Sequence, residues 1–455
     1  MNFSKTSNND NFAENQYNKM VNTPVSKLIT SLAIPTVISM LVTSIYNMAD
    51  TFFVSQISTQ ASAAVGVVFP IMSIIQAFGF TLGMGSGSLI SIRLGQKRNE
   101  EANVIVSTAF FTAIGIGFLI TILGIIFSTQ FLSLVGASNT ILPYAQDYAK
   151  YIFFGAPIMT ASFVLNNVLR SEGKAFFSMI GLTTGGILNI ILDPIFIYAL
   201  DLGISGAAIA TLCSQSISFL ILLTCFLKHK TVCHINIKLY SLKKEVLPKI
   251  VTTGFPSLSR QGLSSISSIL LNTAAGSYGD AAIAGMSITT KIIMFVASVM
   301  IGIGQGFSPV SGYNYGAKRY DRVKQAYKFT LCAGSILMGS VAVVIFIFAR
   351  QIMNGFINDS QAVEIGVAAL RWQVAFIPFH PLIIGTNMLM QSTRHIKSAT
   401  YLSMNRNGIY FIPAILILPR VIGLQGVEMA QFVADVLSAI TAVPFAIYFF
   451  KKMSK

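Results

Sequence analysis

Long, unbroken runs of apolar residues follow one another along nearly the whole chain, separated by short polar segments. Each run reaches about 20 residues, the length that an α-helix needs to cross the hydrocarbon core of a bilayer. The runs are continuous rather than alternating, which argues against membrane-spanning strands. We count about twelve runs and predict an all-α polytopic membrane protein, with spans near residues 26–50, 61–86, 104–127, 143–166, 176–200, 204–227, 247–272, 281–306, 326–349, 364–390, 398–419 and 424–450.

The apolar unit is present twice. The triplet Gly83-x-Gly85-x-Gly87 recurs as Gly302-x-Gly304-x-Gly306, and several other anchors keep the same register, a shift of 219–221 residues. They are Pro35 with Pro256, Pro157 with Pro378, Gly95-x-Lys97-Arg98 with Gly316-x-Lys318-Arg319, and Gly203-x-x-Gly206 with Gly423-x-x-Gly426. Two six-span units in one orientation are expected to form lobes related by a pseudo-twofold axis along the membrane normal, with a cavity between them. The predicted organisation is a tail at 1–25, lobes at 26–227 and 250–455, and a linker at 228–249.

The charges indicate topology. The chain has 31 Lys and Arg against 16 Asp and Glu, a formal net charge of +15. Basic residues gather at both chain ends and after even-numbered spans, at 93–98, 170–174, 228–249, 318–328 and 394–397, while the other loops carry Asp147, Asp201, Asp280 and Asp359. The positive-inside rule then puts both termini and the linker in the cytosol of a cytoplasmic-membrane protein. The excess charge therefore does not indicate nucleic-acid binding. We read the polar, Asn-rich first 22 residues as a mobile cytoplasmic tail and the linker as a surface segment on anionic headgroups.

The candidate chemistry lies in the first half. A charge at bilayer depth is costly and is a functional hypothesis by default. Asp50 lies in span one and Asp193 in span five, directly before Pro194. Tyr46 precedes Asp50 by one helical turn and Asn189 precedes Asp193 likewise, so each pair shares a helix face. Such a set can hold a proton or a sodium ion. The simpler readings are a water-exposed Asp50 and an Asp193 that caps a helix break.

Taken together, these features resemble the multidrug and toxic compound extrusion (MATE) family over essentially the whole chain. The motifs that carry the resemblance are the duplication, Tyr46-Asn47-x-x-Asp50, Asn189-x-x-x-Asp193-Pro194 and the Gly-x-Lys-Arg loops. The resemblance implies a secondary antiporter that exports drug-like or amphipathic organic compounds by alternating access, acting as a monomer. It implies H⁺ or Na⁺ as coupling ion, with no cofactor and no other metal. By resemblance, the cation-coupling residues are Asp50, Asn189, Asp193 and Thr211, the surrounding polar network is Tyr46, Tyr148 and Asn166, and the bending proline is Pro35.

The second half departs from one branch of that family, which carries carboxylates in spans seven and ten. Span seven offers Arg260 and Gln261 instead, and Lys291, Arg406 and Asp435 lie in or near other spans. One hypothesis is an internal scaffold in which Arg406 pairs with Asp435, since unpaired charges there would be expensive. The other is a cation-lined cavity that suits an anionic or zwitterionic substrate.

Other function classes fit less well. A flippase for a lipid-linked or anionic precursor, of the same superfamily, would use a cationic cavity but usually has more than twelve spans. A membrane enzyme would need clustered nucleophiles, bases or metal ligands, and the four histidines are scattered. His380, between Pro378 and Pro381, is isolated in sequence, and the four cysteines show no paired metal spacing. A phosphate-binding G-x-x-x-x-G-K-[ST] motif does not occur, so transport is expected to run on an ion gradient. A non-transporting receptor or scaffold fits the composition but does not account for the duplicated lobes.

Overall fold

The chain is a multi-pass membrane protein built from helices, as the apolar runs predict. The computed structural model describes residues 3–228, 230–241 and 245–453, and these contain helices and no strands. The first half consists of α1 (Phe3–Asn22), α2 (Val25–Ser55), α3 (Thr59–Gly95), α4 (Asn99–Ile126), α5 (Ser128–Leu134), α6 (Leu142–Ser171), α7 (Ala175–Pro194), the π-helix η1 (Ile195–Ala199) and α8 (Gly203–Leu227). The linker carries the 3-10 turn η2 (Ile237–Leu239).

The second half consists of α9 (Val246–Gly276), α10 (Asp280–Gly316), α11 (Tyr320–Asn354), α12 (Ser360–Phe376), η3 (Ile377–Phe379), α13 (His380–Ser392), α14 (Ile396–Met404), the π-helix η4 (Asn405–Ile409), α15 (Phe411–Ile422) and α16 (Leu424–Met453). In the described residues, 10 helical segments are long and apolar enough to cross a membrane. The other two predicted spans are also helical. One is α9, which is diluted by serine and threonine, and the other is broken by η4 between α14 and α15.

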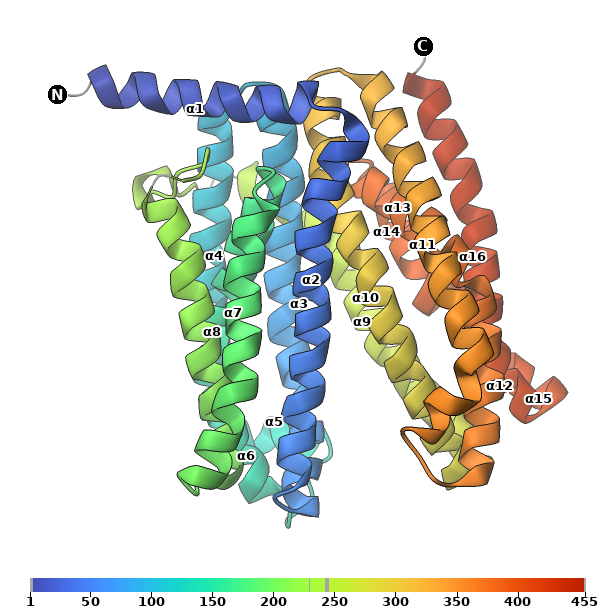
Figure 1. Cartoon of the computed structure of the whole chain (residues 1–455). Coiled ribbons are helices and arrows are strands. Elements are labelled where there is room, and N and C mark those ends of the chain that lie inside the picture. The colour runs from blue at the N-terminus through green and yellow to red at the C-terminus, as the bar shows by residue number, and fades with distance from the viewer. Residues whose placement is uncertain (1–2, 229, 242–244, 454–455) are drawn as a thin grey trace.

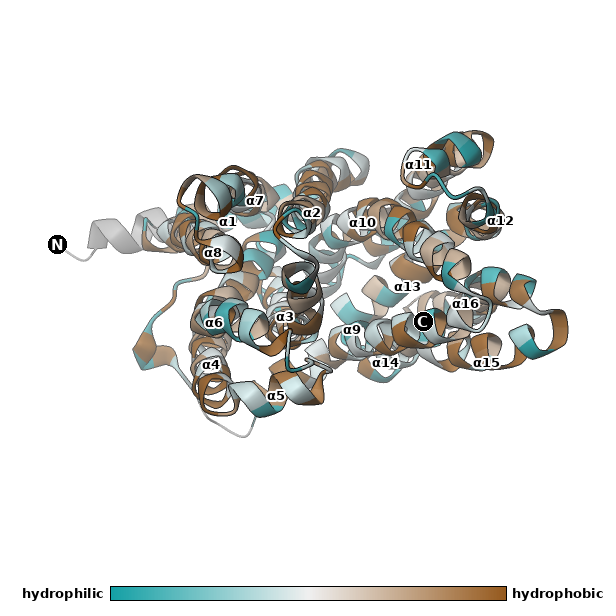
Figure 2. Cartoon of the chain, turned by 90° about the horizontal axis from the view of Figure 1, so that it is seen from below, coloured by the Kyte–Doolittle hydropathy of each residue, from teal (hydrophilic) through white to brown (hydrophobic). Residues whose placement is uncertain are grey.

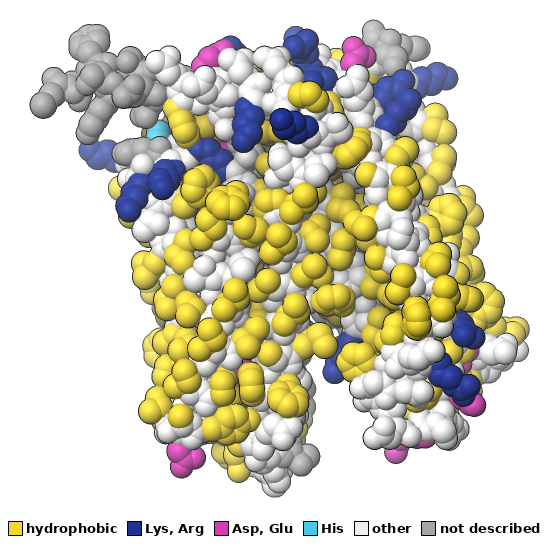
Figure 3. Space-filling view, in the orientation of Figure 1, with side chains coloured by type: hydrophobic (Ala, Val, Ile, Leu, Met, Phe, Trp, Pro, Cys, Tyr) yellow, Lys and Arg dark blue, Asp and Glu magenta, His cyan; other side chains and the backbone are white. Residues whose placement is uncertain are grey.

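The helices form two bundles, α2–α8 and α9–α16, which stand side by side (Figures 1 and 2). The bundles meet at the end where both termini lie and diverge toward the opposite end. Lys and Arg side chains gather at the end with the termini, and a cleft opens between the bundles at the other (Figure 3). We call these the basic end and the open end. Large apolar side chains such as Leu134, Ile336 and Val421 are more than 70% exposed, as expected of surfaces that contact lipid.

The repeat in sequence is also a repeat in backbone geometry. Lys97 and Lys318 both have left-handed φ, at 59° and 58°, at the same place in the two loops of the basic end. Gly203, at the start of α8, and Gly423, directly before α16, likewise have φ of 53° and 65°. Left-handed backbone is uncommon for a residue with a Cβ atom. Its recurrence at two lysines therefore shows that the same loop has been kept in both halves.

Glycine lets the two bundles pack closely at the basic end. A Cβ atom on Gly306 of α10 would lie 2.6 Å from the backbone nitrogen of Ala33 in α2, and one on Gly302 would lie 2.7 Å from Val37 Cα. In α9, a Cβ atom on Gly254 would overlap the backbone of Thr81 in α3. Gly302 and Gly306 of the second triplet, together with Gly254, thus let helices of the two bundles pack closely and close the basic end.

The amino-terminal segment is not the tail that the sequence suggested. Residues 3–22 form α1, which lies across the basic end, perpendicular to the bundles (Figure 1). Gln16 Nε2 donates to the carbonyl of Glu172 in the first bundle at 2.6 Å, and Asn314 Nδ2 of the second bundle donates to the carbonyl of Met20 at 3.2 Å. The Met20 side chain is fully buried. Since α1 lacks an apolar run, no local sequence pattern predicts it, and the helix is stabilised by these tertiary contacts.

The linker is also fixed to the first bundle. The carboxylate of Glu172, which is fully buried, accepts the backbone N–H of Val232 at 2.8 Å and that of Cys233 at 2.9 Å. Desolvation raises the pKa of Glu172, while these hydrogen bonds act in the opposite direction. Burial, together with the neighbouring Glu172, raises the pKa of the Cys233 thiol well above its ordinary value. The part of the linker around Cys233 is therefore packed against the first bundle and is not a loose surface segment.

Candidate functional site

Two parallel helices of the first bundle bring the predicted acidic residues together. Gly186 of α7 packs against α2, since a Cβ atom there would lie 2.7 Å from Val42 Cγ1 and 3.2 Å from Tyr46 Cδ1. Asp50 lies one turn beyond Tyr46 on α2, and Asp193 lies two turns beyond Gly186 on α7. The close packing of α7 on α2 therefore brings the two carboxylates near enough to interact electrostatically.

The amide of Asn189 joins α7 to α8 at this point. Its Nδ2 atom donates to Asp193 Oδ1 at 3.3 Å and to Thr211 Oγ1 of α8, also at 3.3 Å. Tyr148 of α6 is fully buried beside Asp50, Asp193 and Thr211. Thus the structure brings together six of the seven residues expected at the cation site and its polar network, namely Tyr46, Asp50, Tyr148, Asn189, Asp193 and Thr211.

Buried oxygen atoms in this group have no hydrogen-bond donor. Asp193 is fully buried, and its Oδ2 atom has no hydrogen-bond partner in the described part of the chain. The same holds for Asp50 Oδ1 and for Asn189 Oδ1. A buried acceptor without a donor is unfavourable by about 1–3 kcal/mol. A proton shared by the carboxylates, or a sodium ion held by several oxygens, would remove this penalty, so the donor set fits either ion.

The helix break after Asp193 also anchors this group to α2. Pro194 ends α7 and the chain continues as η1, where the phenol of Tyr198 donates to the carbonyl of Phe53 at 2.8 Å. Pro35 lies inside α2, 15 residues before Asp50, within the part that packs against the second bundle. Its role as a hinge remains a prediction.

Asn166 does not join the acidic group, which corrects the expectation drawn from the family resemblance. Its Nδ2 atom donates to Ser178 Oγ at 2.7 Å. Ser178 precedes Asn189 by 11 residues on α7, or about 16 Å along the helix. The repeat explains this position, because Asn387 makes the matching contact with Ser403 Oγ, at 2.8 Å, in the second half. Both asparagines tie neighbouring helices together near the basic end.

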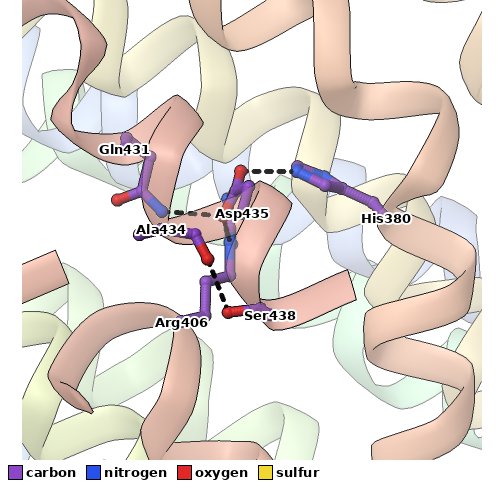
Figure 4. A network of polar contacts seen from close by, with 6 residues as sticks. All are labelled: His380, Arg406, Gln431, Ala434, Asp435 and Ser438. Carbon is purple, nitrogen blue, oxygen red and sulfur yellow. Dashed lines mark hydrogen bonds and ion pairs between the residues drawn. The ribbon is translucent and has the colours of Figure 1, made fainter. Parts of the chain in front are cut away.

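The second bundle holds an ionic network that includes the predicted pair (Figure 4). Arg406 Nε, in η4, lies 2.7 Å from Asp435 Oδ1, which confirms the expected partners. His380 Nε2 lies 2.9 Å from Asp435 Oδ2, and Gln431 Nε2 donates to Asp435 Oδ1 at 2.8 Å. Asp435 and His380 are almost fully buried. The three partners of the buried Asp435 carboxylate support the scaffold hypothesis for Arg406 and Asp435.

Arg260 and Lys291 lie outside this network. Neither forms a hydrogen bond or ion pair within the described residues. Arg260 is half-buried on α9, whereas Lys291 is exposed on α10. Of the cations considered for a cavity, these two are the ones that the network around Asp435 does not hold.

Sequence reasoning missed His380 and Gln431 as partners of Asp435. Gln431 precedes Asp435 by four residues on α16, so the helical spacing carried a local signal. His380 comes from another helix, 55 residues away, and only the packing of α13 against α16 brings it near.

Comparison with known proteins gives consistent similarities. The profile of the MatE family matches residues 35–195 and 256–416, which is more than half of the chain and begins at the paired prolines Pro35 and Pro256. The chain is 27% identical to the multidrug export protein MepA of Staphylococcus aureus (strain N315) over 421 residues, 92% of this chain and 93% of that protein.

Solved structures agree over almost the full length. An outward-facing conformation of a multidrug resistance MATE family transporter of the MOP superfamily superposes with a TM-score of 0.92 at 27% identity, covering 96% of this chain and 98% of that one. A MOP superfamily transporter from Pyrococcus furiosus Vc1 (DSM3638), for which a reverse polarity of the binding pocket has been described, gives a TM-score of 0.90 at 28% identity, with the same coverage.

Proposed function

Because the chain belongs to the MATE family, we propose that it is a secondary antiporter that exports drug-like or amphipathic organic compounds in exchange for H⁺ or Na⁺. The observation that carries the proposal is the group of buried, unsatisfied oxygens on Asp50, Asn189 and Asp193. The relatives named above as multidrug exporters support the class of cargo. The chain acts as a monomer and needs no cofactor besides the coupling ion.

The orientation follows from the charges. The basic end faces the cytosol with both termini, by the positive-inside rule. The cleft of Figure 3 then opens to the outside. In this state the coupling ion enters from outside and neutralises the carboxylates of Asp50 and Asp193.

The ion and the cargo act through one conformational equilibrium. Neutralising Asp50 and Asp193 removes the repulsion between the carboxylates and lets α2 repack against α7, with Pro35 as the hinge. This repacking weakens cargo binding in the open cleft, so that the ion and the cargo reduce each other's affinity.

The test is flux in proteoliposomes with a pH gradient and a sodium gradient applied separately. We expect one of the two gradients to drive uptake of a cationic dye or of an organic anion, tested side by side, by the parent, and Asp193→Asn to abolish that uptake. Asp147→Asn is the matched control, since Asp147 is an exposed carboxylate at the open end of α6, and it should transport like the parent. Equal transport by Asp193→Asn and the parent under every gradient would refute the mechanism.

A second candidate function is a flippase for a lipid-linked or anionic precursor. Arg260 and Lys291, which have no ion-pair partner in the part of the chain that the structure describes, favour it. A flippase would move a fluorescent anionic lipid between leaflets without either gradient, whereas the antiporter would not.

A further inference from the structure

A lysine lies on an apolar wall between the two bundles at membrane depth. Lys291 follows the first residue of α10 by 11 residues, about 16 Å along the helix from the open end. Its side chain is exposed and has no hydrogen bond or ion pair in the described part of the chain. A lone cation at this depth is unfavourable unless something neutralises or solvates it.

Lys291 lines a cavity that is otherwise apolar. The cavity has a volume of about 590 Å³, and among the described residues Lys291 is the sole charged one in its wall. That volume falls in the range of sites for drug-sized ligands. The wall combines residues of α2, α10, α11 and the segment that follows α11, chiefly Ile45, Met48, Phe52, Phe295 and Phe356.

The cavity lies where the bundles separate. The hydroxyls of Ser44 in α2 and Ser298 in α10 are 3.0 Å apart and join the two helices. Lys291 lies seven residues, about 10 Å, nearer the open end on α10, where α2 and α10 diverge (Figure 1). The cavity is therefore a side mouth of the cleft, with walls from both bundles, and its shape must change when the bundles move.

We propose that this cavity binds a drug-sized amphiphile with one anionic head group, whose head pairs with Lys291 and whose hydrocarbon tail lies on the apolar wall. A phosphate or carboxylate would satisfy the lysine, and the lack of any acidic residue in the wall leaves that partner to the ligand. The proposal rests on the proposed transport function, since it names a class of cargo. It assigns the head-group contact to a residue of the second bundle, away from the acidic group of the first.

The test is equilibrium binding without any gradient, so that a failure of ion coupling does not affect it. The protein, in nanodiscs of zwitterionic lipid, carries Phe295→Trp in a Trp372→Phe background, because Trp372 is the only native tryptophan. Quenching by tail-brominated dodecyl phosphate and by equally brominated dodecyltrimethylammonium reports binding at the cavity wall. We expect Lys291→Gln to weaken binding of the phosphate about tenfold or more and to leave binding of the ammonium compound unweakened.

Two further variants separate the head-group contact from general effects. Lys291→Arg keeps the charge and should retain the binding of dodecyl phosphate. Lys328→Gln removes an exposed lysine near the basic end of α11 and should bind both probes like the parent. Equal phosphate affinity in the parent and Lys291→Gln would overturn the proposal, as would a preference of the parent for the ammonium probe. Displacement of the probe by a two-chain phosphatidic acid at equal mole fraction would overturn the restriction to drug-sized ligands.

Discussion

The contact of Gly254 with Thr81 gives the sharpest test of how the basic end stays closed. In Gly254→Ala, the new Cβ atom would lie 2.7 Å from the carbonyl carbon of Thr81 and 3.0 Å from its Cα, and closer still to the oxygen. All three are backbone atoms, so no side chain can move aside. Overpacking of this kind typically costs about 1–3 kcal/mol. Since the strain exists only while the bundles are closed, the closed population should fall about 5- to 150-fold relative to open ones.

Thiol labelling measures this shift. Ser88 of α3 is buried at the closed interface, so Ser88→Cys, in a background with Cys213, Cys225, Cys233 and Cys332 replaced by serine, reports its opening. We expect Gly254→Ala to speed maleimide labelling of this position while the protein stays folded. Gly262→Ala is the control on the same helix, because a Cβ atom there has no neighbour within 4 Å. It should label like the parent and gain up to about 1 kcal/mol of helix stability.

The reasoning fails if Gly254→Ala and Gly262→Ala label Ser88→Cys at the same rate and melt at the same temperature. That result would mean that α9 and α3 can separate slightly without loss. The close contact would then play no part in holding the basic end shut.

Two further predictions concern buried carboxylates. Asp435→Asn should lower the Tm strongly, because breaking a buried ion pair typically costs about 3–5 kcal/mol. Gln431→Ala removes one neutral hydrogen-bond donor and should cost about 1 kcal/mol. Equal Tm values for the two variants would contradict the network of Figure 4. Cys233 should label slowly at pH 8 and faster as the pH rises, since its raised pKa leaves little reactive thiolate. Glu172→Gln should speed labelling at pH 8 by removing the negative charge and loosening the linker; an unchanged rate would refute that role.

Local patterns predicted much of the fold and the acidic group. The apolar runs gave the helices, and the four-residue spacing of Asn189 and Asp193 gave their shared face. The pairing of α2 with α7 could not be read from those patterns, because it depends on the small volume of Gly186 against Val42 and Tyr46. The family resemblance, and not a local pattern, predicted that most residues of the acidic group lie close together.

The errors and omissions have the same physical origin. Asn166 was placed by resemblance in the polar network, whereas the structure shows it bonded to Ser178, as Asn387 is to Ser403 in the second half. The helix α1 was missed because its sequence is polar and its order comes from contacts distant in sequence, such as Asn314 with Met20. His380 gave no signal for the corresponding reason, since its partner lies on another helix.

The helix α1 makes the two lobes of a duplicated molecule unequal. Rotation about a twofold axis would exchange the lobes, but a single helix that lies across the first lobe and reaches the seam at the basic end has one position and one direction. Its bonds to Glu172 and Asn314 anchor it on both sides of the seam. A bulky fusion at the amino terminus would therefore disturb the contacts of α1 with both lobes, so tags for purification or imaging are better placed after α16.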